Sequence, residues 1–183
     1  PGLRWPDLAL QGGRLAWSAV RDALPQARGV SVLSGTRRGH ELSAGPVEAV
    51  LDAGRRGGAT VICDVPRRMT DIEIAALDVA DLVIAITTCD VRGVAAASAL
   101  TPVLRAVNPN VGLVVRGPSP GGLRATEVAE VVAAPLLTAM RPEPMLAERL
   151  EQGGLRLRRR SPLAAAAREV LEVLPSRSGG RAA

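Results

Sequence analysis

The chain has 183 residues, of which 47% are hydrophobic, and this length and composition suit one domain with a sizeable core. All 23 basic residues are Arg and none is Lys, which excludes a phosphate-binding loop built around a lysine, and no run approaches the ~20 apolar residues that a membrane-spanning helix needs. The net charge of +5 permits contact with nucleic acid or an anionic membrane without establishing it.

Before residue 59, glycine and proline separate short helical and strand-like segments. An amphipathic segment with Leu15, Val20 and Leu24 on one face predicts a helix that ends at Pro25. Pro46 suits the first turn of the next helix, which a pair of glycines closes. The elements expected here are an irregular lead-in at 1–11, a helix at 14–24, a strand at 29–34, a polar loop at 35–45 and a helix from 46 to 56.

The next stretch is an apolar, β-branched run, Thr60–Cys63, that leads into Asp64, Val65, Pro66 and Arg67. The run shows no polar alternation, so it predicts a strand buried on both faces, as in a parallel sheet. Pro66 cannot donate a ladder hydrogen bond and ends the strand. Asp64 therefore lies at the carboxyl end, where open α/β sheets bind ligands, and it either holds Mg²⁺ (directly or through water) or caps the following turn.

Beyond this run, helices and strands alternate regularly. Thr70 with Glu73 three residues later predicts a capping box. Ser161 followed by Pro162 predicts the start of the last helix. The elements expected here are helices at 71–80, 91–107, 123–133, 145–152 and 162–174, strands at 82–87, 111–115 and 135–140, and a basic connector at 153–160.

This order of elements predicts an α/β fold with a mostly parallel sheet flanked by helices. Neither repeats nor a domain boundary is visible, so one domain is expected over residues 1–175, followed by a disordered tail at 176–183. Cys63 and Cys89 lack metal-ligand spacing and are interpreted as small core residues. His40 is the single histidine, and a solvated loop residue is the expected role.

Polar residues follow several predicted strands, and the carboxyl ends of parallel strands meet at one edge of a sheet. Thr88 and Asp90 have a structural alternative, since either could cap the helix that follows. Arg67 and Arg68 either form a solvated turn or pair with phosphates, and Arg156–Arg160 is either an exposed connector or a contact with an anionic surface. The residues expected at this edge are Ser34, Asp64, Arg67, Thr87, Thr88, Asp90 and Arg116.

Three motifs resemble the second half of MinD/ParA-type phosphate-loop ATPases: Asp-x-Pro-Arg at 64–67, a helix ending Ala-Ala-Leu-Asp-Val-Ala-Asp-Leu at 75–82, and a strand ending Thr-Thr-Cys-Asp at 87–90. Within that superfamily the chain is similar to the CpaE/TadZ-like subgroup of pilus-assembly and localisation proteins. The segments Ala-Leu-Pro-x-x-x-Gly-Val-x-Val-Leu-Ser and Arg-Arg-Ser-Pro-Leu-Ala-x-Ala-x-Arg-Glu fit the same subgroup. The resemblance extends from Leu8 to Leu174 and implies a P-loop NTPase-like fold.

The resemblance also implies roles for individual residues. Asp64 matches the acidic residue that approaches the Mg²⁺ of bound ATP through water, and Pro66 and Arg67 match the switch turn. Arg116 stands where many relatives place an Asn that reads adenine, which puts adenine recognition in doubt here. The remaining nucleotide-binding positions that it implies are Thr87, Thr88 and Asp90 at a strand end and Pro142 in the turn beside the base.

Family members begin with a strand and a glycine-rich phosphate loop, neither of which this sequence contains. The expectation is a C-terminal portion, incomplete at the N-terminus, of a protein that uses ATP and Mg²⁺. No cofactor is expected for this portion alone, and no catalytic residue is assigned. The implied function is regulation of septum placement, cell division or polar localisation, by an ATPase or a degenerate ATPase scaffold.

The same resemblance implies a homodimer that binds proteins of the division or pilus/secretion machinery. It would be cytoplasmic and recruited to the septum, a pole or the inner membrane surface. Two alternatives remain open. One is a DNA-associated partition-type protein that uses Arg156–Arg160 and the tail, and the other is a small α/β phosphate-handling enzyme that uses Asp64 and Asp90.

Overall fold

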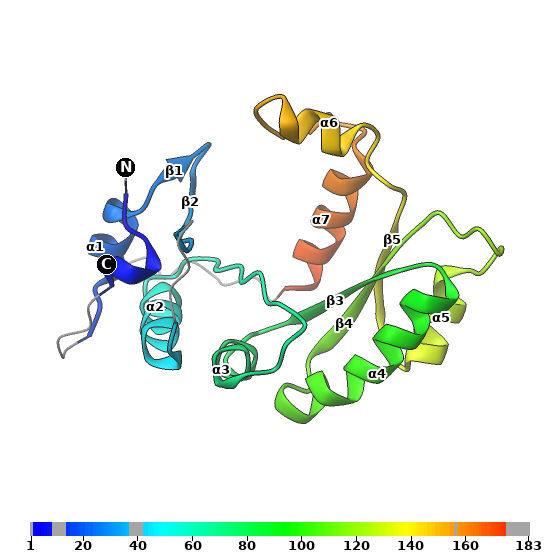
Figure 1. The fold of residues 1–183 in the computed structure, drawn as a ribbon, viewed down its shortest axis with the longest axis horizontal. Helices are drawn as coiled ribbons and strands as arrows, with labels where there is room; N and C mark the ends of the chain where they lie inside the picture. Colours follow the sequence, from blue (N-terminus) through cyan, green and yellow to red (C-terminus); the bar gives the residue numbers. More distant parts are fainter. Residues whose placement is uncertain (1, 9–13, 37–41, 156, 175–183) are drawn as a thin grey trace. The chain divides into compact units, whose positions relative to one another are not determined.

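The computed structural model of the chain describes residues 2–8, 14–36, 42–155 and 157–174 (Figure 1). These fall into two compact units, one over Pro1–Val79 and one over Ala80–Ser176. His40, Arg156 and the predicted tail at 176–183 lie outside the described residues.

The second unit contains the parallel sheet. Its strands are β3 (Val83–Thr88), β4 (Val111–Arg116) and β5 (Leu136–Met140), in the spatial order β3-β4-β5. All pairings in this sheet are parallel, and the register places Val83 opposite Val111 and Thr88 opposite Arg116. Thr88, Arg116 and Met140 therefore end the three strands side by side, and the predicted α/β fold class is confirmed.

Helices connect and flank these strands. Helix α4 (Val91–Val107) packs mainly against β3 and α5, helix α5 (Ala125–Val132) packs against α4 as well as β4 and β5, and helix α7 (Pro162–Val173) packs against β5. Figure 1 shows α4 and α5 on one side of the sheet and α7 on the other. The short helix α6 (Leu146–Glu151) follows β5, and α4 continues through Pro102 without a break.

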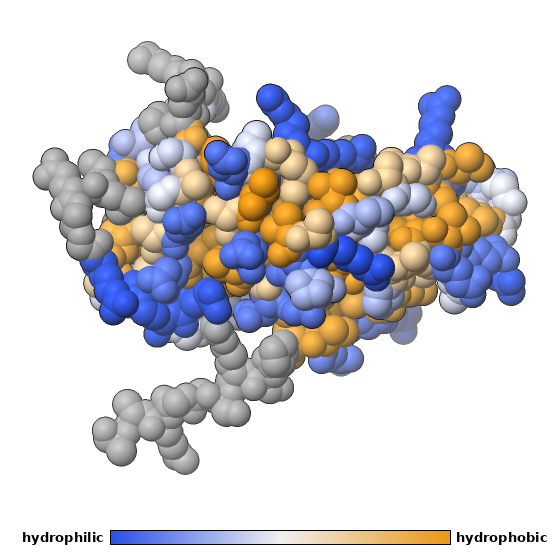
Figure 2. All heavy atoms as spheres, turned by 90° about the horizontal axis from the view of Figure 1, so that it is seen from below, coloured by the Kyte–Doolittle hydropathy of each residue, from blue (hydrophilic) through white to orange (hydrophobic). Residues whose placement is uncertain are grey.

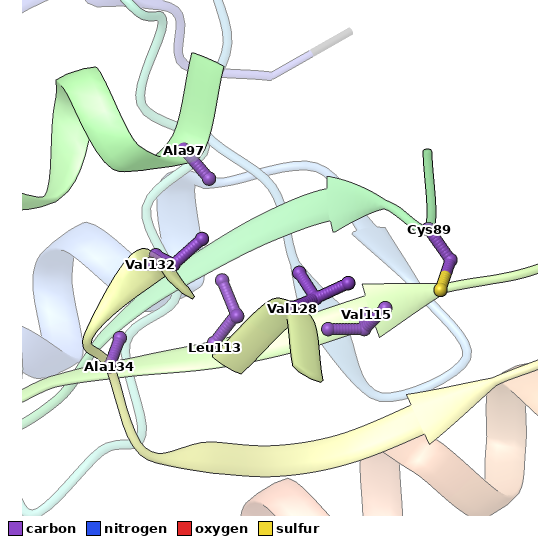
Figure 3. Packing of buried hydrophobic residues seen from close by; sticks show 7 residues of the cluster. All are labelled: Cys89, Ala97, Leu113, Val115, Val128, Val132 and Ala134. Carbon is purple, nitrogen blue, oxygen red and sulfur yellow. The ribbon is translucent and has the colours of Figure 1, made fainter. Parts of the chain in front are cut away.

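The core of this unit lies between the sheet and the helices α4 and α5 (Figure 3). The central strand β4 lies between β3 and β5 and is buried along almost its whole length, as is typical of the central strand of a parallel sheet. Leu113, on β4, and Val128, on α5, are each 0% exposed. Since the chain has no Phe or Tyr, small side chains fill this core, and its members are Cys89, Ala97, Leu113, Val115, Val128, Val132 and Ala134.

The first unit is mainly helical. Its described residues form the turn η1 (Trp5–Asp7), helices α1 (Trp17–Ala23), α2 (Ala44–Arg56) and α3 (Asp71–Asp78), and two short strands, β1 (Gln26–Ala27) and β2 (Val30–Ser31). The strands pair with each other in antiparallel fashion. The helices α2 and α3 share a small core in which Val47, Leu51 and Ala76 are buried. The predicted capping box of α3 is confirmed, since the Thr70 N–H donates to the Glu73 carboxylate at 2.8 Å.

One central expectation is wrong. The run Thr60–Cys63 is not a strand, and the described chain from Ala59 to Pro66 adopts no regular secondary structure. Its side chains are exposed, including Ile62 at 87%. The physical reason is that β-branched residues form a strand only where another strand supplies hydrogen bonds, and the two strands of this unit pair with each other.

Two related expectations, the burial of Cys63 and the strand at 29–34, are also corrected by the structure. Cys63 is exposed and is not a core residue, whereas Cys89 is buried as predicted. The strand predicted at 29–34 is reduced to the two residues of β2, because its partner β1 is itself only two residues long. Val61 still makes a local contact, because its side chain occupies the space beside Gly54 of α2, where a Cβ would approach within 2.6 Å.

Hydrophobic side chains reach the surface in both units. Figure 2 shows one face on which hydrophobic residues lie among strongly hydrophilic ones. In the first unit Val30 is 60% exposed, and in the second Ile86 of β3 is 67% exposed. Among the described residues no helix is both long enough and apolar enough to cross a membrane.

Candidate functional site

The candidate site lies at the carboxyl-terminal edge of the parallel sheet in the second unit. Ligands of open α/β sheets bind in the crevice outside this edge, because side chains and loops from several strands converge there. Thr87 is buried at the end of β3, and Thr88, the next residue, is exposed. The parallel register brings Thr88 opposite Arg116, and Arg116 in turn lies opposite Met140.

The start of α4 forms one side of this edge. Asp90 caps the helix, and its carboxylate accepts a hydrogen bond of 2.8 Å from the Gly93 N–H. That N–H, together with the Thr88 hydroxyl, lowers the pKa of Asp90 below its usual range, so the carboxylate is ionised at neutral pH. The capping role of Asp90, one of the two alternatives drawn from the sequence, is therefore the one observed.

Gly93 makes this cap possible. A Cβ at position 93 would lie 2.4 Å from both the carbonyl oxygen and the hydroxyl oxygen of Thr88. These separations are far below van der Waals contact, so a side chain at 93 would push α4 away from β3. The close approach of helix and strand holds Thr88 and Asp90 in a fixed arrangement beside the sheet edge.

A pocket of about 310 Å³ opens beside the ends of β4 and β5. Its wall is mainly apolar, which is typical of pockets that take a small organic ligand. Arg141, the residue directly after β5, contributes a charged side chain to the lining. The lining residues are Cys89, Val115, Gly117, Ser119, Leu123, Ala125, Ala139, Met140 and Arg141.

The two uncharged polar side chains of the pocket, Cys89 and Ser119, differ in whether they have a hydrogen-bond partner. The Cys89 thiol donates to the Leu123 carbonyl oxygen at 3.2 Å and is thus already bonded within the protein. The Ser119 hydroxyl oxygen is buried and has no hydrogen-bond partner among the described residues. A buried polar group normally has a partner, so the Ser119 hydroxyl is free to bind a ligand atom or a water molecule in the pocket.

The structure distributes the nine residues that the sequence singled out between the two units, and Ser34, which was expected at the sheet edge, lies in the first unit. Thr87, Thr88 and Asp90 lie together at the junction of β3 and α4. Arg116 is exposed at the end of β4, between the pocket residues Val115 and Gly117, and Pro142 follows the pocket residue Arg141. Asp64, Pro66 and Arg67 belong to the first unit, where all three are exposed.

A magnesium site is only partly provided by these residues. In the described ranges no group of three or more His, Cys, Asp or Glu side chains is placed to hold a metal ion. Mg²⁺ commonly takes one or two carboxylates and completes its shell with phosphate oxygens and water, a role that the exposed Asp64 carboxylate could fill. The chain itself has no lysine to bind the phosphates of such a ligand.

Sequence reasoning missed most of the pocket. Ser119, Leu123 and Met140 were not singled out, although each lies on a loop or strand end that the alternating pattern had placed at the correct edge. The Gly-Pro-Ser segment directly after a buried strand is the signal that could have identified Ser119. Cys89 was assigned to the core, and it also lines the pocket.

Comparisons with known proteins agree with this fold. No family model matches the chain. Its structure is similar to that of a ParA family ATPase from Chlorobium tepidum TLS, with a TM-score of 0.62 and 10% sequence identity over 72% of this chain and 57% of that chain. This likeness shows that the chain has a fold in common with a ParA family ATPase.

Two uncharacterized proteins of Mycobacterium tuberculosis, one from strain CDC 1551 / Oshkosh and one from strain ATCC 25618 / H37Rv, are much more similar in sequence. Each is 72% identical to this chain over 181 residues. The match covers 99% of this chain and 52% of each relative. The chain therefore spans about half the length of these relatives.

Proposed function

We propose that this chain is the ParA-like portion of a longer nucleotide-dependent regulator that positions cell-division or surface machinery. Within the MinD/ParA superfamily it would belong with the CpaE/TadZ-like proteins and resemble the actinobacterial septum-site-determining protein. The observation that carries the proposal is the pocket at the carboxyl edge of a ParA-like parallel sheet. In open α/β folds this edge is the position where nucleotides bind.

The pocket suits the base of a nucleotide. Val115, Leu123 and Met140 present apolar surface to the faces of a planar ring, and the Ser119 hydroxyl offers one hydrogen bond to its edge. Arg116 lacks the paired donor and acceptor of an amide, so preference for adenine over guanine would be weak. Thr88 and the exposed start of α4 lie on the side toward which the sugar and phosphates would extend.

The phosphates and Mg²⁺ need groups that this chain does not contain. ATP and Mg²⁺ are accordingly proposed as cofactors of the longer protein, with Asp64 contributing a carboxylate to Mg²⁺ through water. The relatives carry roughly as much chain outside the match as within it, which leaves room for a phosphate loop. This portion alone would bind nucleotide weakly and would not hydrolyse ATP.

The biological role is proposed on the same basis. The longer protein would form a homodimer, either driven by nucleotide or permanent, and bind proteins of the division or pilus/secretion machinery at the septum, a pole or the inner membrane surface. A carboxylate-based enzyme is a poorer fit, since the proposed second carboxylate, Asp90, is ionised and occupied as a helix cap.

Nucleotide binding tests the proposal. Titration of a fluorescent ATP analogue with Mg²⁺ into the full-length M. tuberculosis relative and, in parallel, into this chain should give tight binding only for the former. Asp64→Ala in the longer protein should weaken binding in the presence of Mg²⁺ but not in its absence. Asp78→Ala, which removes an exposed carboxylate at the end of α3, is the matched control. If neither the full-length relative nor this chain binds the ATP analogue, a nucleotide-dependent role is contradicted.

The pocket itself can be tested through Cys89. In a variant of the longer protein whose other cysteines, Cys63 included, are replaced by Ser, a thiol reagent reports on Cys89 alone, and bound nucleotide should slow the reaction. Ala139→Leu, which adds bulk to the pocket wall, should abolish this protection. Ala95→Leu, at an exposed position of α4, should leave it unchanged. Nucleotide binding without protection of Cys89 would place the base elsewhere.

A further inference from the structure

A second surface of the same unit lies around α6 and the connector to α7. One buried carboxylate, that of Glu143, binds a side chain of α6 and the residue that begins α7, on either side of the connector. Glu143 accepts a hydrogen bond of 3.1 Å from the guanidinium of Arg149 on α6, and one of 2.6 Å from the hydroxyl of Ser161 at the start of α7. The side chain of Glu143 is only 3% exposed, so these bonds are shielded from competing water.

The backbone near the end of the connector is held as well. The Ser161 N–H donates to the Arg158 carbonyl oxygen at 3.0 Å, which closes a turn over residues 158–161. The guanidinium of Arg168, on α7, donates to the Arg159 carbonyl oxygen at 3.4 Å. Two carbonyl oxygens of this turn thus have partners within the protein, and the side chains of Arg158, Arg159 and Arg160 are exposed.

Apolar side chains are also exposed on α6, at the residue that precedes it, and in the segment that leads to α7. Met145 is 60% exposed, Leu150 is 55% exposed and Leu157 is 44% exposed. Leu157 and Arg158 line a groove of about 530 Å³ together with Arg149, Gln152 and two glycines. We refer to Met145, Leu150, Leu157 and the three arginines Arg158–Arg160 as the α6–α7 surface.

The charge of this region is strongly positive. Residues 145–160 contain five Arg and two Glu, a net charge of +3 within 16 positions, whereas the whole chain carries +5. Arginine side chains extend their charged ends toward phosphate while their methylene stems lie along apolar surface. A fixed, basic surface with exposed Met and Leu side chains fits a partner that is anionic at its boundary and apolar immediately beneath it.

We propose that the α6–α7 surface binds the anionic headgroup layer of a phospholipid membrane, with Leu150, Leu157 and Met145 reaching the acyl boundary. A nucleic acid would satisfy the arginines but would leave these apolar side chains in water. The surface also has no aromatic residue on which a base could stack. This proposal does not depend on nucleotide binding, because none of its residues lines the pocket beside β4 and β5.

Vesicle co-sedimentation of the 183-residue chain tests the proposal. Binding is expected to vesicles of phosphatidylcholine mixed with phosphatidylglycerol, and not to phosphatidylcholine alone. The triple substitution Arg158→Gln, Arg159→Gln, Arg160→Gln should weaken binding by about tenfold or more, because each cation near an anionic surface contributes to binding. The control is Arg14→Gln, Arg55→Gln, Arg105→Gln, which removes the same charge from exposed positions elsewhere and should change binding much less.

The apolar contribution separates a membrane from other anionic partners. Leu157→Ser should reduce vesicle binding several-fold, and Val131→Ser, at a position 64% exposed on α5, should have no effect. The same variants are titrated with duplex DNA of mixed sequence. DNA binding that depends on the three arginines while vesicles fail to bind would overturn the proposal in favour of a nucleic-acid surface. Vesicle binding that is insensitive to both Leu157→Ser and the arginine triple would also overturn it.

Discussion

The hydroxyl group of Ser161 joins two parts of the second unit. Its hydrogen is donated to the buried carboxylate of Glu143 at 2.6 Å, and its oxygen accepts the Ala164 N–H at 3.1 Å. The first bond offsets part of the free energy that burial of the Glu143 carboxylate costs, and the second caps α7. One side chain therefore couples the turn after β5 to the start of the helix that packs against β5.

This coupling predicts a dependence of stability on pH. The Ser161 hydroxyl, the Leu163 N–H and the Arg149 guanidinium lower the pKa of Glu143 below its usual range. A carboxyl whose pKa is lowered by folding contributes stability that is fully present above its unfolded pKa, about 4.3, and is lost as pH falls through the folded pKa. We expect Tm to fall in the acidic range, partly because of this residue.

The substitution Glu143→Gln isolates that contribution. It should lower Tm at neutral pH, because a neutral amide cannot replace the ion pair with Arg149, and it should flatten the acid limb of the Tm curve. Thermal unfolding followed by circular dichroism across the acidic range measures both effects. Glu151→Gln, at an exposed position of α6, is the control, and a steep acid limb that Glu143→Gln leaves unchanged would assign the pH dependence to other carboxyl groups.

Leu113 is predicted to be a major contributor to the stability of the second unit. It lies at 0% exposure on the central strand, among side chains too small to fill a cavity by rearrangement. Leu113→Ala should lower the free energy of unfolding by about 2–5 kcal/mol. Urea denaturation measures the change, with Val131→Ala, on the exposed side of α5, expected to stay within about 0.5 kcal/mol of the wild type.

Two glycines in first helical turns should respond oppositely to alanine. Gly93→Ala places a methyl group 2.4 Å from the Thr88 carbonyl oxygen, and the resulting overpacking should cost about 1–3 kcal/mol. Gly45, near the start of α2, has no neighbouring atom within 4 Å of an added Cβ. Gly45→Ala should raise the free energy of unfolding by about 0.4–1 kcal/mol, because alanine has less conformational freedom than glycine in the unfolded chain. Equal effects of the two substitutions would contradict the close approach of α4 to β3.

The two cysteines should differ in reactivity toward a thiol reagent. Cys63 is exposed and should react faster, although partial burial raises the pKa of its thiol, whereas Cys89 is 4% exposed at the pocket wall and should react slowly. The kinetics should therefore show a fast and a slow phase, of which Cys63→Ser removes the fast one and Cys89→Ser the slow one. Addition of denaturant should merge the two phases.

The sequence was sufficient to predict the second unit because its signals are local and agree with one another. The helix at 91–107 was predicted with the bounds of α4, and the strands at 82–87 and 111–115 differ from β3 and β4 by one residue at one or both ends. Apolar runs, a capping aspartate and strand-ending residues all indicate the same structure here. Agreement between levels is what makes a segment predictable.

The strand prediction for Thr60–Cys63 was wrong because its signals did not agree in this way. Its composition is strand-like, but a strand forms only with a hydrogen-bonding neighbour, and no local sequence signal reports whether that neighbour exists. Glu143 shows a second kind of failure. Its partners Arg149, Ser161 and Leu163 are 6, 18 and 20 positions away in the chain, so the burial of this carboxylate could not be read from any periodic pattern.

The edge of β3 has a practical consequence for work with this chain. In the described part of the second unit β3 pairs with β4 on one side only, and Ile84 and Ile86 are 41% and 67% exposed along it. An open, apolar strand edge is a template for association between molecules. Preparations of the isolated chain should therefore lose solubility as concentration rises, and Ile86→Lys should raise the concentration at which precipitation begins while leaving the fold intact.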